Sequence, residues 1–334
     1  MQLRFLHLLV VTTLVLTACD DSTPGDTTDT AAATTADDTT VEDTTVEDTT
    51  VEDTTVEDTT AAEDTTPAVV DTSPLGGDRP ASVYLPVGYD AGESWPLVLL
   101  LHGYGASGAI QDGYLQFHQR ATTAGFVVAV PEGTKDGTQK NFWNASPAWC
   151  CDFGNSGVDD QQYLLDVIAE AKTRFNVDAD RVFLFGHSNG GFMSYTMACE
   201  HADVIAGIAS LAGSGYRLAN DCDPSEPVTI MQMHGTADST IAYAGTTTFP
   251  GAVALTDRWT VYNGCGAEPH VSGTVDYDPA ALGEETVKTT WTDCDNGSAV
   301  ALWTMSFSGH IPIVNESFVP DALAFLLANV PTTE

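Results

Sequence analysis

The stretch Phe183-Leu184-Phe185-Gly186-His187-Ser188-Asn189-Gly190-Gly191 decides how the rest of the chain is interpreted. The apolar run over residues 181–185 predicts a short buried strand, and residues 192–198 predict the start of a helix. Between them lies a G-x-S-x-G motif with Ser188 at its centre. A strand, a sharp turn and a helix around this motif are typical of a nucleophile elbow. We therefore predict that Ser188 is a nucleophile. The alternative is a glycine-rich turn with an idle serine.

The glycines of this motif have a physical reason, which is crowding. Side chains at Gly186 or Gly190 would collide with the neighbouring strand or helix, and the turn forces the serine into a strained backbone conformation. The serine oxygen is then exposed at the N-terminal end of a helix, where the helix dipole favours developing negative charge.

Residues 1–18 have the pattern of a signal peptide. Arg4 lies near the start, and the apolar run over residues 8–16 is shorter than the roughly 20 residues that span a bilayer. The sequence Leu16-Thr17-Ala18-Cys19 is similar to a bacterial lipobox, in which the cysteine becomes the lipidated first residue. We therefore predict a lipid anchor on Cys19. The alternative is an ordinary secretory signal with an incidental cysteine.

Residues 19–75 are predicted to form a disordered acidic linker. Four copies of Val-Glu-Asp-Thr-Thr fill residues 41–60, and residues 20–75 contain 17 Asp and Glu but no Lys or Arg. Such a composition leaves too little apolar surface to offset the entropy of ordering. We expect a self-repelling spacer that reaches about 40 Å or more. A weak calcium-binding tract is the alternative.

The net charge argues against a nucleic-acid partner. The formal net charge of the chain is -36, and removing the linker and Arg4 still leaves -20 on the remaining residues. A domain this acidic has no basic patch with which to bind nucleic acid.

The cysteine count agrees with export. Apart from Cys19 the chain has an even set of six: Cys150, Cys151, Cys199, Cys222, Cys265 and Cys294. In an exported protein such a set predicts disulfides, with 15 possible connectivities. The adjacent pair could form a vicinal bridge or take two separate partners. No spacing of His and Cys resembles a zinc site, and we predict no metal or cofactor.

From residue 76 onward, predicted strands and helices alternate. This alternation predicts an α/β fold, with a mostly parallel central sheet and helices on both faces, in one domain over residues 76–334. The predicted strands are 79–85, 96–101, 125–130, 181–185, 204–211, 228–234 and 299–307, the first two forming a hairpin or adjacent strands. A long loop is predicted over 132–158, and helices over 160–175, 256–263 and 317–329.

A serine nucleophile needs a base, and the base needs an orienting acid. In an α/β hydrolase the acid and the histidine follow the serine along the chain, on loops after later strands. Asp238 and His310 stand at such places. The alternatives are that Asp238 only caps a turn and that Asp257 is the acid. His102, His187 and His234 are expected to have structural roles, with His187 pointing away from the serine.

The same chemistry needs donors for a tetrahedral oxyanion. The first is the backbone N–H of Asn189, directly after the nucleophile. The second is expected from the loop His102-Gly103-Tyr104-Gly105, whose glycines allow a close approach of the backbone. We assign the N–H of Tyr104. The alternative is a plain glycine-rich turn.

Across almost all of residues 78–330, the chain resembles a family of secreted esterases with the α/β-hydrolase fold. This family includes polyhydroxybutyrate depolymerases, feruloyl esterases and acetylxylan esterases. The segments that carry the resemblance are 177–200 with its Ser-Asn-Gly-Gly, 227–243 with its His-Gly-Thr-Ala-Asp, and Asn263-Gly264-Cys265 followed by Trp291 and Cys294.

The resemblance implies that Ser188, Asp238 and His310 form a catalytic triad, and it suggests a bridge between Cys265 and Cys294. Many relatives carry Trp-Pro-Gly after the catalytic histidine, where this chain has Ile311-Pro312-Ile313. We therefore expect a different binding-site wall at that position.

The predicted function is a serine esterase acting through an acyl-enzyme on feruloyl or acetyl esters of plant cell-wall polysaccharide. Trp143 and Trp149 of the long loop are candidates to stack on a sugar or an aromatic acid, although these aromatic residues could also simply pack the loop. A polyhydroxybutyrate polyester is the alternative substrate.

A function of another class is also considered: a surface-displayed binding protein on a hydrolase fold that has lost its chemistry. The tether and the acidic spacer suit display, whereas competent residues at all three triad positions argue against it. No feature marks a peptidase. The predicted protein is an exported monomer that meets a membrane only through Cys19.

Overall fold

The structure, a computed structural model, describes residues 70–145 and 150–332. By its internal contacts the chain forms one compact unit over residues 67–334. The predicted signal peptide, the lipidation site at Cys19 and all but the last residues of the predicted linker lie outside the described residues. Leu75 pairs with Ala81 in an isolated bridge, close to the predicted start of the domain at residue 76.

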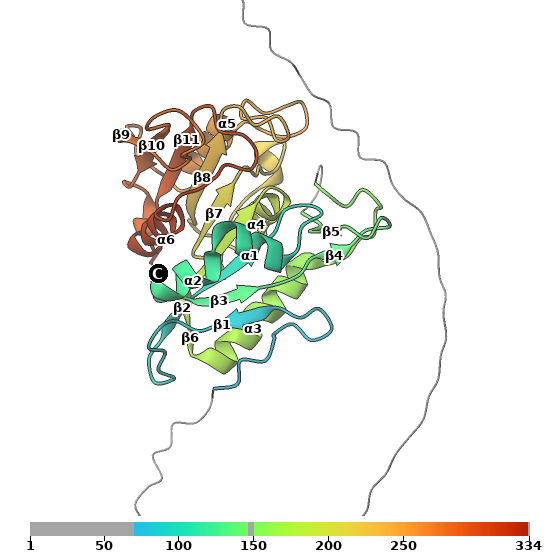
Figure 1. The fold of residues 1–334 in the computed structure, drawn as a ribbon. Coiled ribbons are helices and arrows are strands. Elements are labelled where there is room, and N and C mark those ends of the chain that lie inside the picture. The colour runs from blue at the N-terminus through green and yellow to red at the C-terminus, as the bar shows by residue number, and fades with distance from the viewer. Residues whose placement is uncertain (1–69, 146–149, 333–334) are drawn as a thin grey trace, which may run out of the picture. The chain divides into compact units, whose positions relative to one another are not determined.

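A nine-stranded sheet forms the centre of the unit (Figure 1). Its six central strands are parallel to one another, and antiparallel strands stand only at the two edges. In spatial order the strands are β1 (Ser82–Tyr84), β3 (Val127–Val130), β2 (Trp95–Leu101), β6 (Val177–His187), β7 (Gly207–Leu211), β8 (Thr229–Gly235), β11 (Val300–Met305), β10 (Thr286–Trp291) and β9 (His270–Val275).

Helices cover both faces of this sheet, because the central strands are apolar on both sides. In β2 the side chains of Leu97, Leu99 and Leu101 join one buried cluster, while Val98 and Leu100 join the other, as the period of two along a strand requires. The first cluster contains residues of α3 (Asp160–Phe175), α4 (Asn189–Glu200) and α5 (Ala252–Tyr262). The second contains residues of α1 (Gly108–Leu115), α2 (Phe117–Thr123) and α6 (Phe318–Ala328). The predicted α/β class with a mostly parallel sheet is confirmed.

The strand ends set the position of the functional loops. The register pairs Leu101 with Gly186, Leu211 with both His187 and Met233, and Met305 with Gly235, so that the carboxyl ends of the parallel strands lie at one level. The loops after β2, β6, β8 and β11 therefore leave the sheet at the same edge, which is where ligands bind in open α/β sheets.

Several predicted elements are confirmed and others are corrected. The helix over residues 160–175 has the predicted bounds, with Asp159 capping its first turn and Asn176 ending it in the left-handed conformation. The strand near residue 82 pairs with β3 rather than with β2, so the first two predicted strands are not neighbours. The predicted long loop contains a short hairpin, β4 (Thr134–Lys135) and β5 (Asn141–Phe142). Four elements of the structure, α1, α2, β9 and β10, were not predicted from the sequence.

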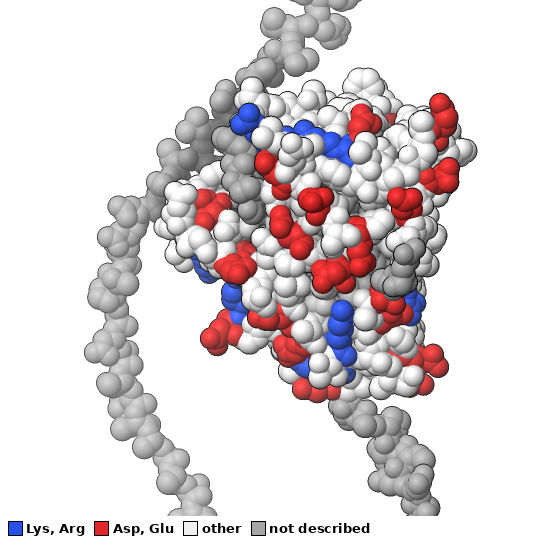
Figure 2. All heavy atoms as spheres, turned by 180° about the vertical axis from the view of Figure 1, so that it is seen from behind, with Lys and Arg blue, Asp and Glu red and all other residues white. Residues whose placement is uncertain are grey.

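Three disulfides join the six cysteines of the unit in the pairs Cys150–Cys151, Cys199–Cys222 and Cys265–Cys294. Such bonds persist in oxidising compartments, which agrees with a protein that acts outside the cytosol. Figure 2 shows acidic side chains scattered over one face with few basic ones among them. Within the described part of the chain, no helix is both long and apolar enough to span a bilayer.

Candidate active site

Ser188 occupies the sharp turn between β6 and α4. Its backbone has φ 54° and ψ −117°, a region that residues other than glycine rarely adopt. Two hydrogen bonds hold this conformation: the N–H of Ser188 donates to the carbonyl of Leu211 at 2.8 Å, and its carbonyl accepts from the N–H of Phe192 at 3.0 Å. The sheet and the helix thus fix the serine from both sides.

The two glycines of the motif make this turn sterically possible. A Cβ atom at Gly186 would lie 2.2 Å from the carbonyl oxygen of Gly190, and a Cβ atom at Gly190 would lie 2.2 Å from the carbonyl oxygen of Leu101. Both distances are far below van der Waals contact. The predicted crowding is therefore present, and it comes from the start of α4 at one glycine and from the end of β2 at the other.

The structure brings together the three side chains that the sequence assigned to a triad. The Oγ of Ser188 lies 2.9 Å from Nε2 of His310, and Nδ1 of His310 lies 2.8 Å from Oδ2 of Asp238. The acid follows β8 and the histidine follows β11. The rival acid Asp257 is an exposed residue of α5. This geometry permits a proton to pass from the hydroxyl to an imidazole that a carboxylate orients.

Asp238 is buried but well supplied with donors. Its Oδ1 accepts from the N–H groups of Thr240 and Ile241 at 2.8 and 2.9 Å, which is the turn-capping role that the sequence offered as the alternative. Burial acts to raise the pKa of Asp238, yet hydrogen bonds from His234 and His310 outweigh it and hold the pKa well below its usual range. Asp238 therefore caps its turn and remains an anion that faces His310.

His187 supports the backbone of His310. Its Nε2 lies 3.0 Å from the carbonyl oxygen of His310, and its Nδ1 lies 3.2 Å from the side-chain amide of Gln111. Burial lowers the pKa of His187 to about 4, so the ring is neutral near pH 7 and donates its Nε2–H to that carbonyl. The prediction that His187 has a structural role agrees with these contacts.

The loop over residues 102–106 passes beside Ser188. A Cβ atom at Gly103 would lie 3.4 Å from the Cβ of Ser188, which places the next residue, Tyr104, near the serine. Asn189 is the first residue of α4, so its N–H is one of those that a helix leaves without an intrahelical acceptor. The assignment of these two N–H groups to an oxyanion site stays a prediction.

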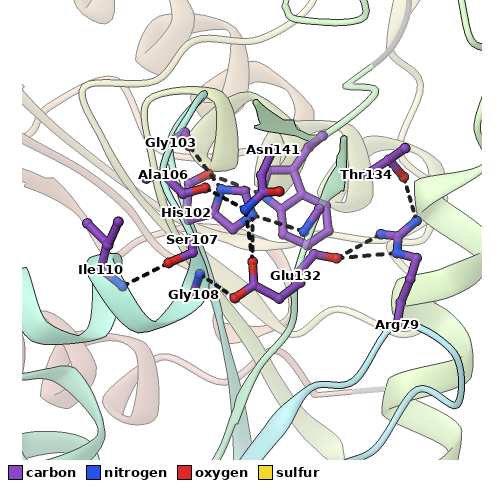
Figure 3. Close-up of polar contacts among 12 residues, drawn as sticks. Arg79, His102, Gly103, Ala106, Ser107, Gly108, Ile110, Glu132, Thr134 and Asn141 are labelled. Atoms are coloured by element: carbon purple, nitrogen blue, oxygen red, sulfur yellow. Dashed lines mark hydrogen bonds and ion pairs between the residues drawn. The ribbon is translucent and has the colours of Figure 1, made fainter. Parts of the chain in front are cut away.

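The 102–106 loop is held from outside by Asn141 and Glu132, which the sequence did not single out. The side-chain amide of Asn141 donates to the carbonyl of Ala106 at 2.9 Å. The backbone carbonyl of Asn141 accepts from the N–H of Gly105 at 2.8 Å. Figure 3 shows Glu132 between Asn141 and the start of α1, where it accepts from Asn141 at 3.2 Å and from the N–H of Gly108 at 2.9 Å. Burial raises the pKa of Glu132.

The predicted role of Trp143 as a stacking surface for substrate is wrong. Phe142 and Trp143 are both fully buried, and Nε1 of Trp143 donates to the carbonyl of His102 at 3.0 Å. The side chain of Asn189 forms two further hydrogen bonds with the backbone of Trp143. This tryptophan therefore packs beneath the 102–106 loop. Trp149 lies outside the described residues.

No metal centre is suggested by the described residues. Across residues 70–145 and 150–332, no three side chains among His, Cys, Asp and Glu are grouped so that they could hold a metal ion.

Comparison with known proteins finds esterases among the similar sequences and structures. Residues 72–219 match the family model described as "Putative esterase". The chain is 29% identical over 247 residues to Feruloyl esterase B of Piromyces equi, covering 70% of this chain and 42% of that protein. It is 25% identical over 254 residues to Feruloyl esterase D of Neurospora crassa, covering 73% of this chain and 77% of that protein.

The solved structure of acetyl xylan esterase from Aspergillus awamori is similar in fold. It matches with a TM-score of 0.55 and 14% identity, and the match covers 78% of this chain and 98% of that one. At this identity the likeness extends to the fold alone, and it agrees with the predicted α/β-hydrolase arrangement.

Replacing Gly190 by alanine is expected to lower the free energy of unfolding by about 1–3 kcal/mol, because the new methyl group would force the end of β2 to shift. The matched control is Gly113→Ala in α1, where a Cβ atom would meet nothing within 4 Å. That change should raise stability by about 0.5–1 kcal/mol. Urea unfolding of both variants measures the difference, and a Gly190→Ala protein as stable as the control would contradict the crowding argument.

Proposed function

We propose that this chain, whose residues 72–219 match an esterase family model, hydrolyses carboxylic esters through an acyl-enzyme on Ser188. One observation carries the proposal: hydrogen bonds run without a gap from Ser188 through His310 to Asp238, at 2.9 and 2.8 Å. A structural serine has no need of a base at hydrogen-bond distance that is itself oriented by a buried carboxylate.

In the first half of the proposed reaction, Ser188 Oγ forms a bond to the ester carbonyl carbon as its proton moves to Nε2 of His310. The carbonyl oxygen becomes an anion, and the N–H groups of Tyr104 and Asn189 are proposed to stabilise it. The carbon–oxygen bond to the alcohol then breaks, and His310 returns the proton to the departing alcohol. In the second half, water repeats these steps on the acyl-enzyme and releases the acid.

The preferred substrate is an acetyl or feruloyl ester on plant cell-wall polysaccharide. The two relatives reported above are both named feruloyl esterases. A cleft of about 510 Å³ adjoins the 102–106 loop, and Figure 3 shows several of its polar lining residues. Among the lining residues are Arg79, Ser107, Glu132, Thr134, Lys135 and Asn141. Such a surface suits the hydroxyl groups of a sugar chain.

A polyester is the second candidate, and one observation favours it. Ile311 and Ile313 directly follow His310 and are each 64% exposed. Exposed aliphatic side chains beside a reaction centre suit an apolar polymer better than a hydrated polysaccharide.

We also propose that the mature protein is tethered by lipid at Cys19 and acts as a monomer outside the cytosol, with residues 19–75 as the spacer. The three disulfides of the folded unit support an oxidising location.

Replacing Ser188 by alanine is expected to lower kcat on 4-nitrophenyl acetate by about 10⁴- to 10⁶-fold, because no other hydroxyl is positioned against His310 among the described contacts. Ser94→Ala at an exposed position is the matched control and should leave kcat unchanged. Circular dichroism and thermal unfolding establish that both variants are folded. Normal turnover by a folded Ser188→Ala protein would reject the proposed mechanism.

Substrate class is tested by comparing kcat/KM on methyl ferulate, acetylated xylan and hydroxybutyrate oligomers. The proposal expects one of the two plant-type esters to be preferred. The variant Lys135→Ala should weaken the reaction on acetylated xylan and leave 4-nitrophenyl acetate unaffected, since only a polymer reaches the cleft. Lys172→Ala on α3 is the control. A preference for the oligomers would favour the polyester instead.

Lipidation is tested by growing a bacterial host with an alkyne-tagged fatty acid. The wild-type chain is expected to carry the tag and a Cys19→Ser variant to lack it. A wild-type chain without the tag, exported in soluble form, would favour the ordinary secretory signal.

A further inference from the structure

A second histidine contacts the carboxylate of Asp238. While Oδ1 of Asp238 accepts from the backbone of Thr240 and Ile241, Oδ2 lies 2.8 Å from Nδ1 of His310 and 3.2 Å from Nε2 of His234. Two imidazole rings therefore meet at the same oxygen. Only one of them, His310, also reaches Ser188.

The hydrogen-bond partners of Gln232 fix which nitrogen of His234 carries the proton. Its side-chain amide lies 3.0 Å from the carbonyl oxygen of Gly213 and 2.9 Å from Nδ1 of His234, while the other end of the amide lies 2.9 Å from the hydroxyl of Tyr195. A carbonyl oxygen can only accept, so the amide nitrogen must face Gly213. The same nitrogen then donates to Nδ1 of His234, which leaves the proton on Nε2.

That Nε2–H is directed at the loop of the acid. It lies 2.8 Å from the carbonyl oxygen of Ile241 and 3.2 Å from Oδ2 of Asp238, so it is shared between two acceptors. The chain of groups is buried: Tyr195 and His234 are each 1% exposed and Gln232 is 0% exposed. With little water to compete, each hydrogen bond in this chain constrains the position of the next group.

We propose that His234 is a positioning residue, which holds Oδ2 of Asp238 in the place where it orients His310 toward Ser188. This inference rests on the proposed function. The backbone donors fix only Oδ1, and without the Nε2–H of His234 the other oxygen is held by His310 alone. The carboxylate and the imidazole can then move together, away from the serine. A displacement of about 1 Å in such an arrangement can cost about 100-fold in rate.

Two amide variants distinguish the effect of the Nε2–H donor of His234 from the effect of its side-chain volume. In His234→Gln the side-chain nitrogen falls near the position of Nε2 and keeps a donor toward Asp238. In His234→Asn the shorter side chain ends near the position of Nδ1, where its oxygen can accept from Gln232, and no donor reaches Asp238. We expect kcat on 4-nitrophenyl acetate to fall by at least about 10-fold in the Asn variant with KM unchanged, and by less than about 3-fold in the Gln variant. Equal kcat values in the two variants would overturn the proposal.

The same changes are then made in an Asp238→Asn background. Because His234 is proposed to act through Asp238, His234→Asn should lower kcat by less than about 2-fold there. An equal loss in both backgrounds would show a general structural role and overturn the inference. If Asp238→Asn alone leaves kcat intact, the proposed function fails rather than this inference.

A measurement on the wild-type chain tests the proposal without any variant, so it does not depend on whether the variants fold. Long-range ¹H–¹⁵N correlation spectra of ¹⁵N-histidine-labelled protein identify the protonated nitrogen of each neutral ring. The proposal expects the Nε2–H form of His234. Finding the Nδ1–H form would remove the donor toward Asp238 and overturn the proposal.

Discussion

The close contact between the helix that begins at Asn189 and the end of β2 is the constraint on which the candidate site depends. At Gly190 the helix passes so near the carbonyl of Leu101 that no side chain fits between them. This contact keeps Ser188 in a backbone conformation that it would not adopt alone and places its hydroxyl above the carboxyl ends of the strands. It also brings the first N–H of α4 beside the 102–106 loop, so one contact positions both the proposed nucleophile and the proposed oxyanion donors.

Around this turn, the histidines have different roles, which depend on their burial and on their hydrogen-bond partners. Burial lowers the pKa of His102 and of His187 to about 4, and each neutral ring then supports backbone near the site. His102 accepts from the N–H of Gly133, and His187 contacts the carbonyl of His310. Among the histidines of the described residues, His310 alone lies between a serine and a carboxylate. The residue type is the same in each case, and the partners determine whether it can transfer a proton.

Local pattern was enough to predict the elements that carry the site. The helix over residues 160–175 has a clear apolar period and a capping aspartate, and the strands that precede Ser188, Asp238 and His310 each contain a largely buried run. The helices α1 and α2 were missed because they are short, and α1 contains two glycines. Strands β9 and β10 are largely exposed or half-buried, so they lack the apolar run that marks a core strand. The predicted neighbour of β1 was wrong because strand order depends on contacts between residues that are distant in sequence.

The supporting residues of the site could not be predicted for the same reason. Asn141, Glu132 and His234 act through partners that only the fold brings near, and the position of Trp143 depends on its contact with the 102–106 loop, which is distant in sequence.

The central claim, that Ser188 attacks an acyl carbon with the help of His310, is tested most directly by trapping the nucleophile. The full chain is incubated with a fluorophosphonate ester, digested, and analysed by peptide mass spectrometry. The account predicts one adduct per chain, on the peptide that contains Ser188, with a parallel loss of esterase activity. An adduct on another residue, or full activity after Ser188 is labelled, would contradict it.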